Sequence, residues 1–225
     1  MQKTTFTKEQ RAIHKLIVDS IGMSDIGLFD GKMGIILSLI TYSRSNKLKC
    51  VEEMADFLME QVLENMTKTS PLSFLNGITG IGWGIEYLIQ NGYMSGCGAD
   101  ICTEIDKKLM SCDIRRVDDL SLEHGIYGWL HYIVAHIQGA NRCGKQVFDR
   151  MYIIDLISKI NEYSENNATS EEFSNLQAMF REVLNGATDV YKFPLEEIVK
   201  TDIKFSLNNL SLSKGLAGYL ITKHI

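Results

Sequence analysis

The sequence of 225 residues predicts an all-α fold: an α/α toroid, that is, a ring or open arc of about five helical hairpins in one domain spanning residues 1–225. Two observations lead to this prediction. A nine-residue pattern containing Gly-x-x-Gly recurs four times, and expected helices with one apolar face alternate with helices that are apolar on nearly all sides. A third observation excludes a sheet: no segment combines period-two alternation with turn signals.

The four copies of the pattern cover residues 26–34, 72–80, 120–128 and 210–218. Each copy has an apolar residue, a small residue, another apolar residue and two variable positions before Gly-x-x-Gly, and an apolar run follows. The first glycines lie 46, 48 and 90 residues apart. Self-similarity at a period of roughly 20 to 50 residues indicates a repeat architecture. Because the last interval is twice 45, one copy is expected to have lost the pattern.

The expected elements alternate along the chain. Outer, amphipathic helices are predicted over residues 7–21, 51–66, 99–112, 148–163 and 194–205. Inner helices are predicted over residues 31–44, 77–90, 125–138, 171–184 and 215–225, the fourth of them without the glycine pattern. Thr7 is placed to begin the first helix, and Asp30 is a favoured N-cap residue for the second. Asn91-Gly92 matches a helix C-cap.

The alternation has a physical meaning. A helix with one apolar stripe packs on a single layer, whereas a helix that is apolar all round must be surrounded, so the two kinds build concentric layers. Glycines at i and i+3 lie on one helix face and let inner helices approach closely at their N-terminal ends. A glycine inside a helix costs about 1 kcal/mol relative to alanine. Its repeated use therefore indicates close packing.

Composition restricts the class of partner. The net charge of -5 and the pI near 5.6 argue against a nucleic-acid partner. Five cysteines form an odd set without metal-ligand spacing, and no signal peptide is recognised, so reduced thiols and a cytoplasmic location are expected. No apolar run approaches the length of a membrane span.

The repeats resemble those of the lanthionine cyclase (LanC-like) family. The segments Leu75-Asn76-Gly77-Ile78-Thr79-Gly80-Ile81-Gly82 and Ser213-Lys214-Gly215-Leu216-Ala217-Gly218 carry the resemblance, which runs from about residue 7 to the C-terminus. It implies the α/α toroid. In cyclases of the family, a Cys from one inner-helix turn and a Cys-His pair before the next glycine hold zinc. The metal turns a substrate cysteine into a thiolate that adds to a dehydrated Ser or Thr.

This sequence departs from the family at the zinc ligands. The residues before the four glycines are Phe29-Asp30, Leu75-Asn76, Glu123-His124 and Ser213-Lys214, and none is a cysteine. Glu123 stands where the family's Cys-His pair has its cysteine. We therefore expect neither a metal site nor a cofactor. Family rings have about six or seven hairpins, so the arc is expected to be open, closed by a partner protein or by self-association, or shortened.

The candidate site is a polar rim around a central bowl that binds a peptide or a small molecule. If the copies superpose, the rim residues before each first glycine are Asp30, Asn76, His124 and Lys214, with Glu123 beside His124. His124 is a candidate general base, Glu123 or Asp30 would orient it, and Lys214 would stabilise an anion.

Some of these residues have simpler explanations. Asp30 and Asn76 are favoured N-cap residues, so capping would account for them, whereas it would not account for His124 or Lys214. As single histidines, His131 and His136 are expected to be hydrogen-bonded core residues. A metal site formed with Cys143 is a weaker alternative.

Two tryptophans occupy near-equivalent positions after their glycines. Trp83 and Trp129 either pack between helices or form an aromatic wall of the bowl that contacts the ligand.

Three functions are compatible with these features. The first is a LanC-like protein without the zinc site, acting as a peptide- or partner-binding module in a peptide-modification or export pathway. The second is a metal-independent enzyme acting on a carbohydrate, with Asp30 and Glu123 as the acid pair. The third is an atypical lanthionine cyclase. Whether the protein is an enzyme is left open by the sequence.

Overall fold

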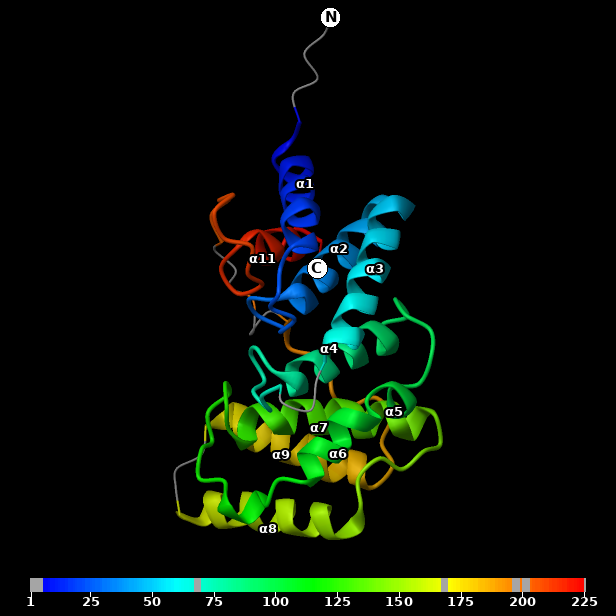
Figure 1. Cartoon of the computed structure of the whole chain (residues 1–225). Coiled ribbons are helices and arrows are strands. Elements are labelled where there is room, and N and C mark those ends of the chain that lie inside the picture. Colours follow the sequence, from blue (N-terminus) through cyan, green and yellow to red (C-terminus); the bar gives the residue numbers. More distant parts are fainter. Residues whose placement is uncertain (1–5, 67–69, 167–169, 196–198, 200–202, 225) are drawn as a thin grey trace, which may run out of the picture. The chain divides into compact units, whose positions relative to one another are not determined.

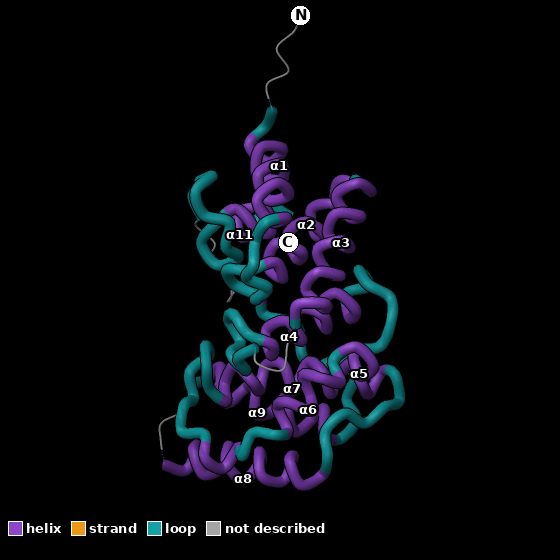
Figure 2. Tube along the Cα trace, viewed as in Figure 1, coloured by secondary structure: helices purple, strands orange, loops and turns teal. Residues whose placement is uncertain are grey.

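The computed structural model describes all residues except 1–5, 67–69, 167–169, 196–198, 200–202 and 225. Throughout the described residues the chain forms helices, turns and loops, without strands (Figures 1 and 2). The all-α prediction is therefore confirmed. The chain divides into two compact units: unit 1 comprises Met1–Thr67 and Pro194–Ile225, and unit 2 comprises Lys68–Phe193.

Unit 1 contains α1 (Lys8–Ile21), α2 (Lys32–Asn46), α3 (Lys49–Asn65) and α11 (Leu216–Ile221). The α2 helix packs against α1, α3 and α11, so the first and last copies of the glycine pattern are neighbours. The predicted start of the first helix is confirmed. Thr7 accepts a hydrogen bond from the backbone N–H of Gln10 at 3.1 Å, and the Gln10 side chain accepts one from the N–H of Thr7 at 2.9 Å.

Unit 2 contains α4 (Ile78–Gln90), α5 (Gly98–Ile101), α6 (Thr103–Met110), the short 3-10 helix η1 (Ile114–Arg116), α7 (Ile126–Arg142), α8 (Arg150–Asn166) and α9 (Glu171–Leu184). The α7 helix packs against α4, α5 and α9, and α8 packs against η1 (Figure 1). Contacts between the Tyr163 and Phe173 rings and between Gln177 and Ser164 join α8 to α9.

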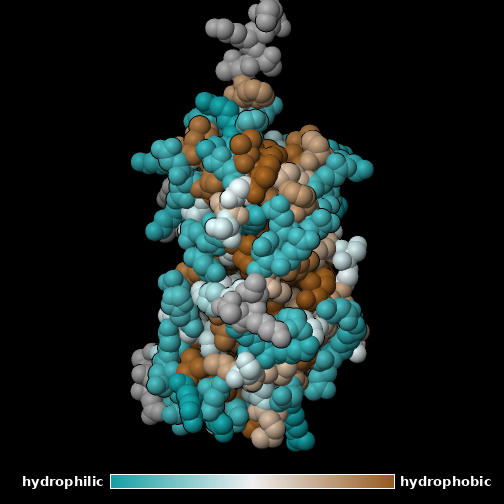
Figure 3. All heavy atoms as spheres, in the orientation of Figure 1, coloured by the Kyte–Doolittle hydropathy of each residue, from teal (hydrophilic) through white to brown (hydrophobic). Residues whose placement is uncertain are grey.

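Burial follows the predicted alternation in α2, α3, α4 and α7 but not in α9. Every residue of α2 from Lys32 to Ser43 is buried, whereas α3 buries only the stripe Val51, Ala55, Leu58, Met59 and Val62. The α4 and α7 helices are likewise enclosed along most of their length. Exposed apolar side chains include Met151 and Ile154 on α8, and Figure 3 shows apolar residues scattered among polar ones on the face drawn. The α9 helix was predicted to be an inner helix, and this prediction is wrong, because α9 buries a single stripe: Phe173, Leu176, Gln177, Phe180 and Val183.

Several predicted boundaries are wrong. The segment 99–112 is two helices, because Cys102, at φ -91° and ψ 10°, interrupts the α-helical hydrogen bonds between α5 and α6. The α7 helix continues to Arg142, α8 begins at Arg150, and α11 ends at Ile221. Half of the predicted helix 194–205 lies outside the described residues, and residues 203–205 are not helical.

Candidate functional site

The four glycine-containing loops share one backbone conformation. In each, the first glycine is the N-cap residue of the following helix, with φ values of -110°, -124°, -99° and -113° and ψ values of -171°, -168°, -174° and -160°. The residue after each glycine donates its N–H to the carbonyl six positions before the glycine. These bonds run from Lys32 to Asp25 (3.0 Å), Ile78 to Pro71 (2.9 Å), Ile126 to Asp119 (3.0 Å) and Leu216 to Asn209 (2.8 Å). The copies are therefore structural repeats.

Side chains within each loop hold this conformation. The oxygen of an Asp or Asn six positions before the glycine accepts the N–H two residues later, at 2.8 Å for Asp25, 2.7 Å for Asp119 and 2.9 Å for Asn209. A serine four positions before the glycine accepts the N–H of the residue just before the glycine. The serines are Ser73, Ser121 and Ser211. The sequence analysis missed this Asp or Asn. Aligning the copies would have found it in three of the four, since the second copy has Pro71 at that position.

The second glycine of the pattern is required by close packing. A Cβ on Gly128 would overlap the carbonyl oxygen of Leu122 and come within 2.6 Å of the Phe74 Cβ. A Cβ on Gly34 would overlap the carbonyl oxygen of Leu28 and come within 2.9 Å of the Leu212 Cβ. The starts of α2 and α7 are therefore pressed against their own loops and against the loop of another copy.

The loops associate in pairs through one recurring hydrogen bond. In unit 2, the N–H of Phe74 donates to the carbonyl of Glu123 at 2.8 Å. In unit 1, the N–H of Leu212 donates to the carbonyl of Phe29 at 2.7 Å. The two hydrogen bonds join equivalent positions. In each pair the donor is three residues before the first glycine of its own loop, and the acceptor is two residues before the first glycine of the other loop. The second copy is thus bonded to the third, and the fourth copy to the first.

The predicted rim residues divide between these two pairs. Asn76, Glu123 and His124 belong to the unit 2 pair, and Asp30 and Lys214 to the unit 1 pair. Asn76 is half-buried, and the other four are exposed. Capping, which was expected for Asp30 and Asn76, is wrong, because the caps are the glycines that follow and neither cap uses a side-chain hydrogen bond. The carbohydrate-enzyme alternative needs an acid pair whose members, Asp30 and Glu123, lie in different units.

The side chains of Glu123 and His124 lie beside each other on the surface of their loop. Their side-chain atoms Oε1 and Nε2 are 3.4 Å apart, and the side chains are 52% and 63% exposed. Such a pair is weak in water, so each partner can exchange it for contact with a ligand.

Both tryptophans are buried within unit 2. Trp83 is fully enclosed and donates its Nε1–H to the Tyr191 hydroxyl at 2.8 Å, and Trp129 is 5% exposed. Packing between helices accounts for them.

A buried charged cluster lies between α4, α6 and α7. His136 has Glu86 Oε1 2.7 Å from Nδ1 and Asp106 Oδ2 2.9 Å from Nε2. The Tyr132 hydroxyl donates to Asp106 at 2.6 Å, and Gln90 donates to Glu86 at 2.6 Å. Burial disfavours the charged imidazole, but the hydrogen bonds to Asp106 and Glu86 outweigh it and raise the pKa of His136 to about 9. His136 is a core histidine, as predicted, and its charged ring pairs with two buried acidic side chains.

His131 has the opposite environment. Burial lowers its pKa to about 4, and its Nδ1 lies 2.7 Å from the Tyr191 hydroxyl. The ring is therefore neutral at physiological pH.

The sequence analysis missed the charged cluster around His136. Its signal was the placement of Glu86 and Gln90 in the otherwise apolar run of an inner helix.

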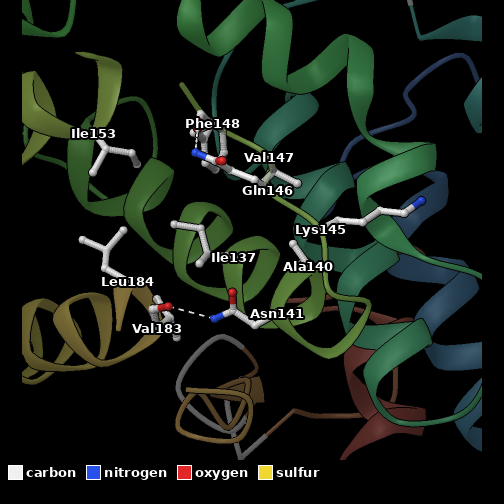
Figure 4. A pocket seen from close by; sticks show the side chains of 10 residues that line it. All are labelled: Ile137, Ala140, Asn141, Lys145, Gln146, Val147, Phe148, Ile153, Val183 and Leu184. Carbon is white, nitrogen blue, oxygen red and sulfur yellow. Dashed lines mark hydrogen bonds between the residues drawn. The ribbon is translucent and has the colours of Figure 1, made fainter. Parts of the chain in front are cut away.

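A pocket of about 220 Å³ opens between α7, α8, α9 and the loop after α7 (Figure 4). Its lining is mainly apolar and includes Ile137, Phe148, Ile153 and Leu184. Asn141 lies at its edge and donates to the Val183 carbonyl at 2.8 Å. The pocket is in the C-terminal part of the 17-residue α7, about 20 Å along that helix from its glycine loop.

Within the described part of the chain, no group of three or more His, Cys, Asp or Glu residues is placed to hold a metal ion. None of the helices there is long and apolar enough to cross a membrane.

The sequence matches no protein-family model, and a search of curated proteins found no match.

Proposed function

We propose that the chain is a LanC-like α/α toroid without the family's zinc site, which binds a peptide or a partner protein through its glycine-containing loops. Its place would be in a peptide-modification or export pathway. The observation that carries the proposal is the repetition of one loop conformation with polar, exposed residues just before the glycine.

The loop pairs support a cyclic order of the repeats. The same hydrogen bond runs from the second copy to the third and from the fourth to the first. In a ring, each loop would donate in this way to the loop of the next copy. The packing of α11 against α2 brings the last inner helix beside the first, as ring closure requires.

The chemistry of the rim favours binding over catalysis by zinc. The positions that hold zinc in family cyclases carry no thiol here. The rim side chains are an acid and a base in each unit, Asp30 with Lys214 and Glu123 with His124. Mixed charges on exposed loops suit the backbone and polar side chains of an extended peptide.

A display experiment tests the proposal. The purified protein would be used to select from a phage library of random dodecapeptides, and a fluorescein-labelled copy of an enriched peptide would be titrated by fluorescence anisotropy. We expect His124→Ala combined with Lys214→Ala to weaken binding at least about tenfold, because about 1.4 kcal/mol of interaction corresponds to tenfold. The single variants would show which loop pair contributes more.

The matched control is His14→Ala combined with Lys49→Ala, which removes one exposed histidine and one exposed lysine elsewhere. The control should bind as the parent does, and both double variants should keep the parental thermal transition. The proposal fails if no peptide is enriched over a surface without protein, or if the rim variant binds with unchanged affinity. Stoichiometric zinc in the purified protein would instead favour the atypical cyclase, and selective sugar binding would favour the carbohydrate enzyme.

A further inference from the structure

A pair of thiols lies at one end of the inner helices of unit 2, away from the glycine loops. Cys97 is the N-cap residue of α5, and Cys143 is the C-cap residue of α7. The two thiols are close enough to interact, and this interaction raises the pKa of Cys143. Cys143 is exposed, Cys97 is partly exposed, and both thiols are free.

Two further contacts hold the segments together. Lys145, two residues after Cys143, forms an ion pair with Asp100, three residues after Cys97, with N–O distances of 2.5 and 2.6 Å. This contact joins the loop after α7 to α5 just beside the two thiols.

The same two segments also close over the carboxylate of Glu86. A Cβ on Gly98 would overlap Glu86 Oε1, and a Cβ on Gly139 would overlap Glu86 Oε2. Gly98 follows Cys97, and Gly139 accepts the backbone N–H of Cys143. The thiol pair is therefore positioned by the helix packing and does not result from two mobile side chains meeting.

We propose that Cys97 and Cys143 are a redox modification site that forms a reversible intramolecular disulfide linking α5 to the end of α7. The inference is independent of the function proposed for the loops. Oxidised glutathione, a small disulfide, is the oxidant class that we assign.

The reaction balances with one molecule of that oxidant. The thiolate of one cysteine attacks oxidised glutathione, which forms a mixed disulfide and releases one reduced glutathione. The second cysteine then attacks the protein sulfur of the mixed disulfide and displaces the second glutathione. The two cysteines lose two electrons and two protons, and the two glutathione thiols gain them.

The environment of Cys143 sets the rate. The interaction with Cys97, burial and the nearby charge of Glu86 raise the pKa of Cys143 to about 11, against the opposing effect of Lys145. The thiolate is the attacking species, so attack by Cys143 should be slow near neutral pH. The rate of that attack should rise about tenfold per pH unit between pH 7 and 9.

The test uses the full chain with Cys50→Ser and Cys112→Ser, which leaves Cys97, Cys143 and the fully buried Cys102. The protein would be equilibrated with mixtures of reduced and oxidised glutathione and analysed by intact mass and peptide mapping. We expect a species lighter by about 2 Da, a peptide pair joined through Cys97 and Cys143, and full reversal by dithiothreitol.

Cys143→Ser in the same background is the control and should never give the lighter species. Accumulation of glutathione adducts or intermolecular dimers in place of the internal bond would overturn the proposal. A bond mapped to Cys102 would overturn it as well. An oxidised form that dithiothreitol does not reduce would refute its reversibility.

Discussion

The charged imidazole of His136 is held by a carboxylate oxygen at each ring nitrogen, and the side chains of His136, Glu86 and Asp106 are at most 6% exposed. Removing one member of such a cluster leaves an unpaired charge in the core, which is strongly destabilising. The cluster therefore makes the stability of unit 2 depend on protonation of this one residue.

The alkaline limb of the stability profile follows from the sign of that shift. The pKa of His136 is raised from 6.5 to about 9, so the stabilisation is complete below pH 6.5 and is lost as pH rises through about 9. We expect the free energy of unfolding to fall by about 1.4 kcal/mol per pH unit between pH 6.5 and 8.5. Urea denaturation checks this, and His124→Ala, which changes an exposed histidine, should leave the slope unchanged. A flat profile would contradict the assignment.

The acid limb of the same profile depends on His131. Its pKa is lowered from 6.5 to about 4, so below pH 6.5 the unfolded chain binds a proton that the folded chain does not. Stability is therefore lost as pH falls from 6.5 towards 4. Taken together, the two histidines place the maximum near pH 6.5, and NMR titration of the imidazole resonances would separate their contributions.

The helices α2, α7 and α11 begin against their own loops, and the second glycine of the pattern makes that approach possible. In three copies the position of a Cβ on this glycine overlaps the carbonyl oxygen six residues earlier. These glycines are Gly34, Gly128 and Gly218. Since the overlap involves backbone atoms, a side chain cannot rotate to relieve it.

An alanine at this position is expected to destabilise the protein. Gly128→Ala should lower the free energy of unfolding by about 1–3 kcal/mol or more, because the added methyl group overpacks the contact with Leu122 and Phe74. Gly22→Ala is the matched control, since a Cβ there meets nothing within 4 Å, and it should change stability by less than about 0.5 kcal/mol. Equal effects in urea denaturation would mean that the packing explanation is wrong.

On the scale of the whole molecule, residues distant in the sequence complete unit 1. The last copy of the pattern supplies Leu212, which is fully buried, bonds to Phe29 through its N–H and packs against Gly34. The first inner helix is therefore covered by a segment about 180 residues later in the chain.

This dependence can be tested with two leucines of the same segment. Leu212→Asp should expose α2 and reduce the protection of its amides from hydrogen exchange, because a charge would be buried without a partner. The amides of α4 and α7, which belong to unit 2, should keep their protection. Leu207→Asp, at a position that is 36% exposed, is the control and should resemble the parent. Equal loss of protection in α2, α4 and α7 would contradict the division into two units.

Much of this molecule was predictable from local patterns. The capping box of Thr7 and Gln10 and the span of α9 follow from residues that are close in the chain. The Gly-x-x-Gly loops were located, but their caps were misassigned to Asp30 and Asn76. The residue preferences at helix N-caps favour Asp and Asn. In the structure, however, the residue after each glycine donates its N–H to a carbonyl seven residues earlier, and the glycine is the cap.

The sequence by itself determined the alternation of helices and the four loops, because both depend on periodicity and on contacts within seven residues of each glycine. Only the tertiary structure decided which loops pair, which carboxylates surround His136 and that Cys97 meets Cys143. Those partners lie about 30 to 180 residues apart in the chain. Their contact is set by how whole helices pack, and no local spacing encodes it.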